Sequence, residues 1–206
     1  MASTSVEAIL QNETRTNMDI FSLRSKTVPA PHCDFAVAVS FVKKADDWYL
    51  LYEVRSAALR RQACEVCFPG GKREEGEDAV ECALRELKEE VNLSPLEVLG
   101  PLPFITKSRG KIVCPVGVIL PDREIAANPA EVADVFTVPL IDLCRREPTC
   151  YSKEHFPCHL VGIPENYAWW NEYDTVPLYE GLPYPVWGLT ARITQQTISL
   201  LKNRNE

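Results

Sequence analysis

Apolar residues along this chain gather in short runs that predict β-strands separated by polar turns. The runs at 35–42 (FAVAVSFV) and 48–54 (WYLLYEV) flank the polar segment KKADD at 43–47. Two β-prone runs around a short polar loop predict a hairpin. Further strand-like runs occupy 97–105 and 111–120.

Two segments have the spacing of amphipathic helices. Between 77 and 91, apolar residues recur at i, i+4, i+7 and i+11, which puts them on one stripe; they are Val80, Leu84, Leu87 and Val91. Gly188 opens a second helix, in which Leu189, Ile193 and Leu200 are expected to face inward. With a further strand at 134–140, the order of strands and helices predicts a layered, mixed α/β fold.

The domain organisation follows from length and local composition. The chain has 206 residues, of which 46% are hydrophobic, and this suits one domain with a real core. Residues 1–30 are polar and weakly patterned, so we expect an N-terminal tail or arm before a single domain at 31–206. The Pro-rich aromatic stretch at 167–187 is expected to be a structured insertion, because exposed Trp and Tyr are costly.

Charge and apolar-run length exclude some classes of function. The net charge of −7 disfavours nucleic-acid binding, although a local basic patch or a metal ion can still serve a phosphate-bearing substrate. The apolar runs are too short to span a bilayer. The first residues lack the basic and apolar regions of a secretory signal, so we expect a soluble intracellular protein.

The eight cysteines are therefore expected to be thiols of a reducing compartment. Cys64 and Cys67 have the spacing of half a zinc site. The second group, around Cys150 and Cys158, lacks regular spacing, so structural zinc is not expected.

The helix predicted at 77–91 carries an unusual set of charges. Glu86 and Glu90 are i,i+4 neighbours with no cation between them, and Glu89 lies beside them. Like charges at this spacing repel each other, whereas hard oxygens one helical turn apart suit Mg²⁺ or Mn²⁺. A solvated charged face is the alternative. The preceding turn with Gly70 and Gly71 favours the metal, because glycines allow a ligand to approach the backbone closely.

These residues match a known motif. Gly71, five residues, Glu77, seven residues and then RELKEEVNL at 85–93 resembles the Nudix box, Gly-x5-Glu-x7-Arg-Glu-U-x-Glu-Glu-x-Gly-U, where U is aliphatic. Every specified position agrees except Asn92, which stands where the box has Gly. The resemblance implies a Nudix α/β/α sandwich with a mixed β-sheet and a Mg²⁺- or Mn²⁺-dependent hydrolase.

The resemblance also implies roles for individual residues. Glu86 and Glu90 are expected to bind the metal together with the backbone carbonyl of Gly71. Glu89 is expected either to bind a second ion or to deprotonate the attacking water. Bound metal polarises the diphosphate and lowers the pKa of water.

Arg85 and Glu77 are expected to pair and to orient the carboxylates around the metal. Asn92 should lie just past the helix C-terminus, where a left-handed conformation is usual. Asn tolerates this conformation best after Gly, so the departure should preserve the helix end.

A second segment indicates the substrate. Residues 51–71 resemble the coenzyme A signature of Nudix CoA diphosphatases, Leu-Leu/Phe-Thr-x-Arg-Ser/Ala-x3-Arg-x3-Gly-x3-Phe-Pro-Gly-Gly. The agreeing positions are Arg55, Ser56, Arg60 and Phe68–Gly71. Glu53 replaces the Thr of the signature and Cys64 replaces its Gly. The stretches 128–140 and 186–193 also resemble peroxisomal-type CoA diphosphatases, so the resemblance spans about 34–200.

The resemblance implies cleavage of CoA, and of acyl-CoA or oxidised CoA, to 3′,5′-ADP and a 4′-phosphopantetheine product. The residues expected to bind substrate are Arg55, Arg60, Phe68, Gly70 and Lys72. Arginine forks suit the phosphates of CoA. Arg61, Arg73 and the basic loop at 107–111 are further candidates for contacting these phosphates. Glu131 is a candidate for an additional catalytic acid near the metal, with an ordinary surface Glu as the alternative.

Two alternatives stay open. One is a Nudix hydrolase for ADP-ribose, NADH or nucleotides, and the other is a catalytically silent Nudix binding domain. The compartment is peroxisomal by resemblance and cytosolic if the C-terminus KNRNE is natural. The chain is expected to be a monomer or a homodimer.

Overall fold

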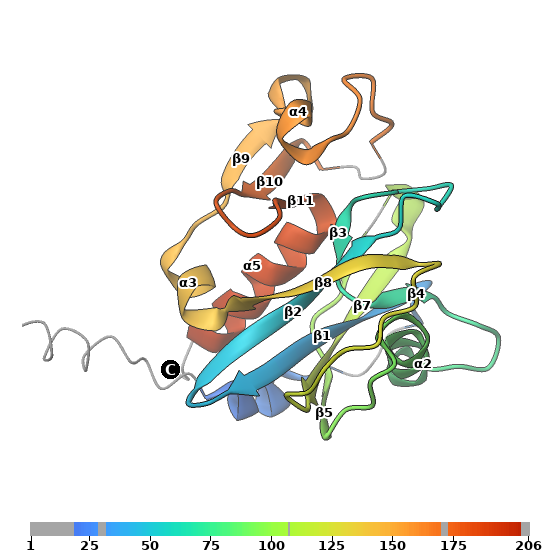
Figure 1. Cartoon of the computed structure of the whole chain (residues 1–206), viewed down its shortest axis with the longest axis vertical. Coiled ribbons are helices and arrows are strands. Elements are labelled where there is room, and N and C mark those ends of the chain that lie inside the picture. The colour runs from blue at the N-terminus through green and yellow to red at the C-terminus, as the bar shows by residue number, and fades with distance from the viewer. Residues whose placement is uncertain (1–18, 29–31, 107, 170–172, 203–206) are drawn as a thin grey trace, which may run out of the picture.

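The structure is a computed structural model that describes residues 19–28, 32–106, 108–169 and 173–202. Its centre is a mixed sheet in which β1 and β7 run parallel and the other pairs are antiparallel (Figure 1). The strands of this sheet are β1 Phe35–Lys44, β2 Asp47–Arg55, β3 Val66–Cys67, β4 Gly70–Lys72, β5 Glu97–Pro101, β6 Ile105–Thr106, β7 Ile112–Leu120 and β8 Val132–Pro139.

The hairpin predicted from the first two apolar runs is confirmed, because β1 and β2 pair antiparallel with Lys44 opposite Asp47. The run predicted at 97–105 is interrupted instead. It divides into β5 and β6, because Pro101 and Pro103 cannot donate to a ladder.

Helices cover both faces of the sheet, as an α/β/α sandwich requires (Figure 1). Alternate residues of β1 point to opposite faces. Ala36 and Ala38 pack in a cluster with α2, whereas Val39 and Phe41 pack in another with α5. The predicted fold class is thus confirmed. The helices are α2 Ala79–Val91, α3 Leu140–Arg145, α4 Cys158–Val161 and α5 Gly188–Lys202, with 3₁₀ turns η1 Ile20–Lys26, η2 Ser108–Gly110 and η3 Lys153–His155.

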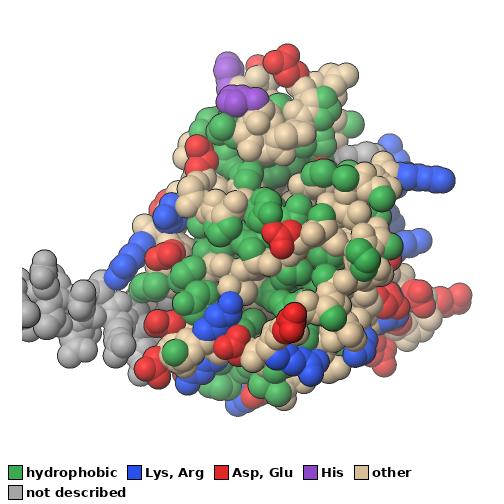
Figure 2. Space-filling model, viewed as in Figure 1, with side chains coloured by type: hydrophobic (Ala, Val, Ile, Leu, Met, Phe, Trp, Pro, Cys, Tyr) green, Lys and Arg blue, Asp and Glu red, His purple; other side chains and the backbone are tan. Residues whose placement is uncertain are grey.

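Helix α2 begins at Ala79, two residues after the predicted start, and the preceding Asp78 forms a capping box with Glu81. Asp78 Oδ1 accepts hydrogen bonds from Val80 N at 2.7 Å and Glu81 N at 2.9 Å, and Glu81 Oε2 accepts from Asp78 N. The predicted stripe is present, with Leu87 and Val91 fully buried. Figure 2 shows acidic side chains gathered at the right edge of this face, where Figure 1 places α2 and the preceding loop.

Part of the predicted N-terminal arm packs on the domain. Ile20 and Leu23 of η1 are fully buried and join the cluster that contains α5. Residues 1–18 and 29–31 lie outside the described residues. The remainder of the expected arm at 1–30 therefore stays a prediction.

The aromatic stretch belongs to a second, three-stranded sheet that the sequence did not predict. Its strands are β9 Thr149–Ser152, β10 Thr175–Tyr179 and β11 Val186–Trp187. A cluster around Phe156, Val176 and Trp187 fills its core, so the expected structured insertion is present in residues 149–169 and 173–187. Across the described part of the chain, no helix is long and apolar enough to cross a membrane.

Candidate active site

The turn at Gly70 and Gly71 meets α2 where the sequence predicted the metal. Gly70 N donates to Glu90 Oε2 at 2.7 Å. A Cβ on Gly71 would lie 2.3 Å from Glu86 Oε1, so glycine lets that carboxylate lie against the turn, and a larger residue would displace it. The Gly71 carbonyl, the third expected ligand, lies 3.8 Å from Cys82 Sγ of the same helix. The turn glycines Gly70 and Gly71 thus lie against the two expected metal-binding carboxylates, Glu90 and Glu86.

Arg85 connects the carboxylates of the site. Its Nε donates to Glu77 Oε1 at 2.7 Å, and its Nη1 donates to Glu86 Oε1 at 2.8 Å and to Glu89 Oε2 at 3.1 Å. Its Nη2 reaches the Lys72 carbonyl at 3.2 Å. The guanidinium therefore holds three acids and the β4 backbone in one arrangement, which is the orienting geometry expected of this residue.

The two expected metal-binding carboxylates lie where burial makes their ionisation costly. Burial raises the pKa of Glu86, which the adjacent Arg85 opposes. Glu90 is only 4% exposed, and burial together with the nearby Glu53 raises its pKa well above the ordinary value. Both groups are thus easier to ionise when another cation is present.

Glu89 differs from its neighbours in exposure. Its side chain is 53% exposed, against 14% for Glu86. It therefore stays open to solvent while Arg85 fixes one of its oxygens. This suits either role expected for it, since both an activating base and a ligand of a second ion must reach water or substrate.

Strand β2 brings two further charged groups to the site. Glu53 lies on the same face of β2 as Leu51, which packs with α2, whereas Arg55 follows a register irregularity after Val54 and lines the pocket described below. Glu53 is fully buried. The sequence analysis noted Glu53 only as a departure from the signature; a glutamate inside an otherwise apolar strand was the available signal. The negative charge of Glu131 raises the pKa of both Glu53 and Glu86, which places it nearby as well.

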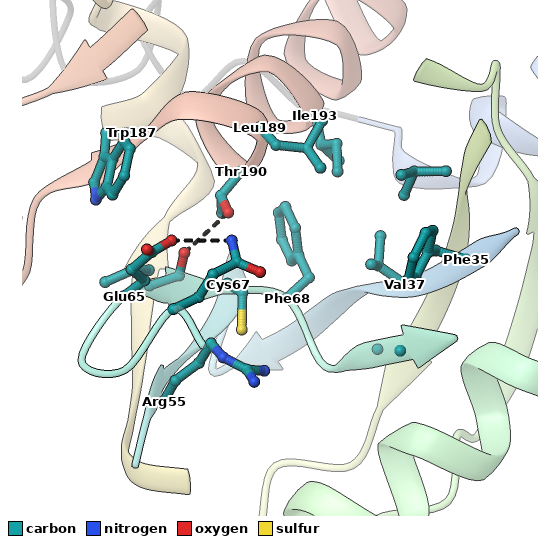
Figure 3. Close-up of a pocket in the computed structure, with 15 residues that line it drawn as sticks. Phe35, Val37, Arg55, Glu65, Cys67, Phe68, Trp187, Leu189, Thr190 and Ile193 are labelled. Atoms are coloured by element: carbon teal, nitrogen blue, oxygen red, sulfur yellow. Dashed lines mark hydrogen bonds between the residues drawn. The ribbon is translucent and has the colours of Figure 1, made fainter. Parts of the chain in front are cut away.

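A pocket of about 230 Å³ opens beside the Gly70–Gly71 turn (Figure 3). Arg55 and Phe68, both expected to bind substrate, line it together with the two glycines. Its other wall comes from the C-terminal part of the chain, where Trp187, Leu189 and Ile193 lie across the pocket from Arg55. These C-terminal side chains are too far from the motifs in sequence to be predicted as neighbours.

The remaining basic candidates lie elsewhere. Arg60 and Lys72 are exposed and do not line this pocket. Arg73 donates to the Cys33 carbonyl at 2.8 Å, and Lys111 pairs with Asp34 at 2.5 Å. Lys107 lies outside the described residues. The two paired cations thus have structural partners, and substrate contact by Arg60 and Lys72 stays a prediction.

Cys64 retains the backbone that the glycine of the signature would favour. Its φ is +62°, in the left-handed region, and Gln62 two residues earlier has a φ of +53°. A non-glycine residue pays roughly 1–2 kcal/mol in this region. The loop geometry is therefore maintained despite the substitution.

The arrangement fits a divalent cation. Glu86 and Glu90 present hard oxygens around a turn whose glycine keeps the space open. One oxygen of Glu53 is buried without a hydrogen-bond partner, although Arg55 is nearby. Repelling carboxylates with an unsatisfied oxygen are stabilised by a cation of higher charge than arginine supplies.

Comparisons with known proteins identify the family. The model of the NUDIX domain family matches residues 35–159. A protein from Photorhabdus laumondii named "Uncharacterized Nudix hydrolase NudL" is 36% identical over 151 residues, which cover 71% of this chain and 74% of that protein. The Escherichia coli K12 protein of the same name is 33% identical over 169 residues, covering 80% and 81%. The chain therefore belongs to the Nudix hydrolase family.

Solved structures are also similar. An Ap4A hydrolase binary complex from Caenorhabditis elegans has a TM-score of 0.44 and 21% identity, covering 54% of this chain and 83% of that one. The NUDIX domain of Shewanella oneidensis NrtR, complexed with ADP ribose, has the same TM-score and identity and covers 57% and 79%.

Proposed function

We propose that this Nudix hydrolase cleaves the diphosphate bond of CoA, and of acyl-CoA or oxidised CoA, to 3′,5′-ADP and 4′-phosphopantetheine. One observation carries the proposal. Residues of the CoA-like signature, Arg55 and Phe68, line a pocket that continues to the turn beside Glu86 and Glu90. The signature and the Nudix box thus meet at the same glycine turn, which supports one continuous site.

In the proposed reaction, Glu86, Glu90 and the Gly71 carbonyl hold Mg²⁺ or Mn²⁺. The bound cation neutralises diphosphate charge and makes water a better nucleophile. Arg85 fixes the positions of the Glu86 and Glu89 carboxylates by donating hydrogen bonds to them at 2.8 and 3.1 Å. Glu89 takes the proton of the attacking water, since its side chain is open to solvent.

Arg55 is proposed to bind a phosphate of the substrate. Its Nε is buried and has no hydrogen-bond partner among the described residues. A guanidinium with unused donors at a pocket wall suits the two-point recognition of phosphate oxygens. Exposed Arg60 and Lys72 are proposed to contact the 3′-phospho-ADP end.

The apolar wall is proposed to accept the pantetheine or acyl arm. Trp187, Leu189 and Ile193 face Arg55 across the pocket, as Figure 3 shows. A pocket with a mostly apolar lining and a few placed polar groups is typical of small-molecule sites.

The second candidate function is hydrolysis of another nucleoside diphosphate derivative, such as ADP-ribose or NADH. Glu53 favours it, because this buried acid stands where the CoA signature has Thr. A silent binding domain is disfavoured, because the box acids are all present and Arg85 orients two of them. A peroxisomal location and a monomeric or dimeric state remain predictions.

The test is product analysis with purified protein and Mn²⁺. CoA should yield 3′,5′-ADP faster than ADP-ribose or NADH is cleaved. Glu89→Gln should lower kcat by at least about a hundredfold, the usual scale for loss of a general base, with an unchanged far-UV spectrum. Cleavage of ADP-ribose or NADH without release of 3′,5′-ADP from CoA would refute the substrate, and a near-normal Glu89→Gln would refute that residue's role.

A further inference from the structure

Glu53 has a buried carboxylate that the protein itself does not satisfy. Its exposed fraction is 0%, and its Oε2 has no hydrogen-bond partner among the described residues. Its Oε1 accepts only a weak donor, the Cys67 thiol, at 3.1 Å. Buried polar atoms almost always have partners, so an unpartnered carboxylate oxygen calls for a water, an ion or another ligand beside it.

The position of Glu53 shows which ligand it faces. It lies on the β2 face that packs against α2, between Leu51 and Arg55. Besides burial, the charge of Glu53 raises the pKa of Glu90, and the charges of Glu131 and Glu86 raise the pKa of Glu53. Glu53 and the acids of α2 therefore share one side of the sheet, although among the described residues no three carboxylate, thiol or imidazole groups are already clustered as a metal-bound site would have them.

Arg55 does not neutralise this group of acids by itself. It is the cation that acts on both Glu53 and Glu90, yet its Nε has no partner in the described part of the chain. Its single positive charge is smaller than the negative charge that Glu53, Glu86, Glu90 and Glu131 carry when they are all ionised. The two unsatisfied atoms are an anionic oxygen and a cationic nitrogen near the end of one strand, and they suit a cation and a phosphate respectively.

We infer that Glu53 is a further ligand of the divalent cation, so that strand β2 completes a metal site begun by Glu86 and Glu90 on α2. The inference rests on the metal site of the proposed function but not on CoA as substrate. It also explains why a glutamate occupies this position, where the CoA-like signature has Thr. In the competing interpretation, Glu53 is a neutral structural acid that only accepts from Cys67.

The experiment measures Mn²⁺ binding to the metal-free full-length protein, by calorimetry and by the loss of the free Mn²⁺ signal in electron paramagnetic resonance. Glu53→Gln keeps the shape of the side chain and removes its charge. It should weaken Mn²⁺ affinity roughly ten- to a hundredfold or more, since even residues that only support a ligand have effects of this size. Metal-free Glu53→Gln should melt no lower than the wild type, and its Tm should rise less on adding Mn²⁺.

The matched control is Glu65→Gln. Glu65 is also buried, but Gln62 and Tyr167 donate to its two oxygens at 3.1 and 2.7 Å. Glu65→Gln should leave Mn²⁺ affinity unchanged. If Glu53→Gln does not fold, Glu53→Thr, which restores the residue of the signature, is measured in its place with the same expectation.

Wild-type Mn²⁺ affinity in the Glu53 variant would overturn the inference. Glu86→Gln separates this failure from failure of the proposed function. If Glu86→Gln weakens Mn²⁺ binding and Glu53→Gln does not, the metal site stands and only the role of Glu53 is wrong. If neither weakens it, the proposed metal site itself is wrong. The assay contains no CoA, so substrate choice does not affect it.

Discussion

At the scale of single residues, the ion pair of Glu77 and Arg85 holds the guanidinium that orients the carboxylates of α2. Glu77 accepts from Arg85 Nε at 2.7 Å and from Nη2 at 3.1 Å. These hydrogen bonds lower the pKa of Glu77 to about 2, with help from the Glu74 amide. The pair thus stays ionised at any pH where the enzyme is expected to work.

This pair predicts a specific pH dependence of stability. Because the folded pKa of Glu77 lies below the ordinary value of 4.5, its contribution is present above pH 4.5 and is lost as the pH falls towards 2. Glu77→Gln should therefore lose less stability than the wild type between these limits. Urea unfolding at several pH values measures the difference, and parallel curves for the two proteins would contradict it.

At the scale of elements, α2 is defined by its two ends. The capping box at Asp78 begins it, and Asn92 ends it with φ +54° and ψ +33°, the left-handed conformation expected for this position. Asn92 N donates to the Lys88 carbonyl at 3.2 Å, and Lys88 Nζ returns a bond to Asn92 Oδ1 at 2.8 Å. The prediction that Asn preserves this helix end is confirmed.

The helix end can be tested with a pair of substitutions. Asn92→Ala should destabilise the protein by about 1 kcal/mol, because Ala resists a left-handed backbone. Asn92→Gly should stay within about 0.5 kcal/mol of the wild type, since Gly adopts this conformation freely but loses the bond to Lys88. The free energy of unfolding in urea distinguishes them. Equal losses in both variants would mean that the side-chain bond, not the backbone, decides stability here.

At the scale of the whole molecule, the second sheet and α5 extend the main domain and supply one wall of the pocket. Trp187 ends β11 and belongs to the aromatic cluster of the second sheet, while it also lines the pocket. Its neighbour Thr190 donates from α5 to the Val66 carbonyl of β3 at 2.9 Å. The shape of the site therefore depends on packing between the two sheets.

A substitution at Phe156 tests this dependence, because Phe156 belongs to the aromatic cluster but is not one of the residues that line the pocket. Its ring lies 5.3–6.0 Å from those of Tyr151, Trp169 and Trp187. Phe156→Ala should cost roughly 3–5 kcal/mol, the usual range for a buried aromatic residue. It should also raise KM more than it lowers kcat, because the metal site is on the other sheet. Thermal unfolding and steady-state kinetics measure both effects, and an unchanged KM would show that the wall is independent of this cluster.

Much of the molecule followed from local pattern. The hairpin, α2 and α5 were predictable because alternation and 3.6-residue periodicity show which side chains are buried. The Nudix box likewise placed Glu86, Glu89 and Glu90 on one helix. The second sheet was not predictable, since its strands are short and β9 at Thr149–Ser152 pairs with β10 at Thr175–Tyr179, which is far along the chain.

The sequence by itself determined the layered fold, the family and the acids of α2, because these depend on spacing within single elements. Only the tertiary structure decided what meets those acids. It brought Arg55 from β2, the glycine turn from β4 and Trp187 from β11 to one pocket, and it placed Glu53 on the side of β2 that packs with α2. Such contacts depend on strand register and on sheet packing between residues far apart in the chain, which local periodicity does not encode.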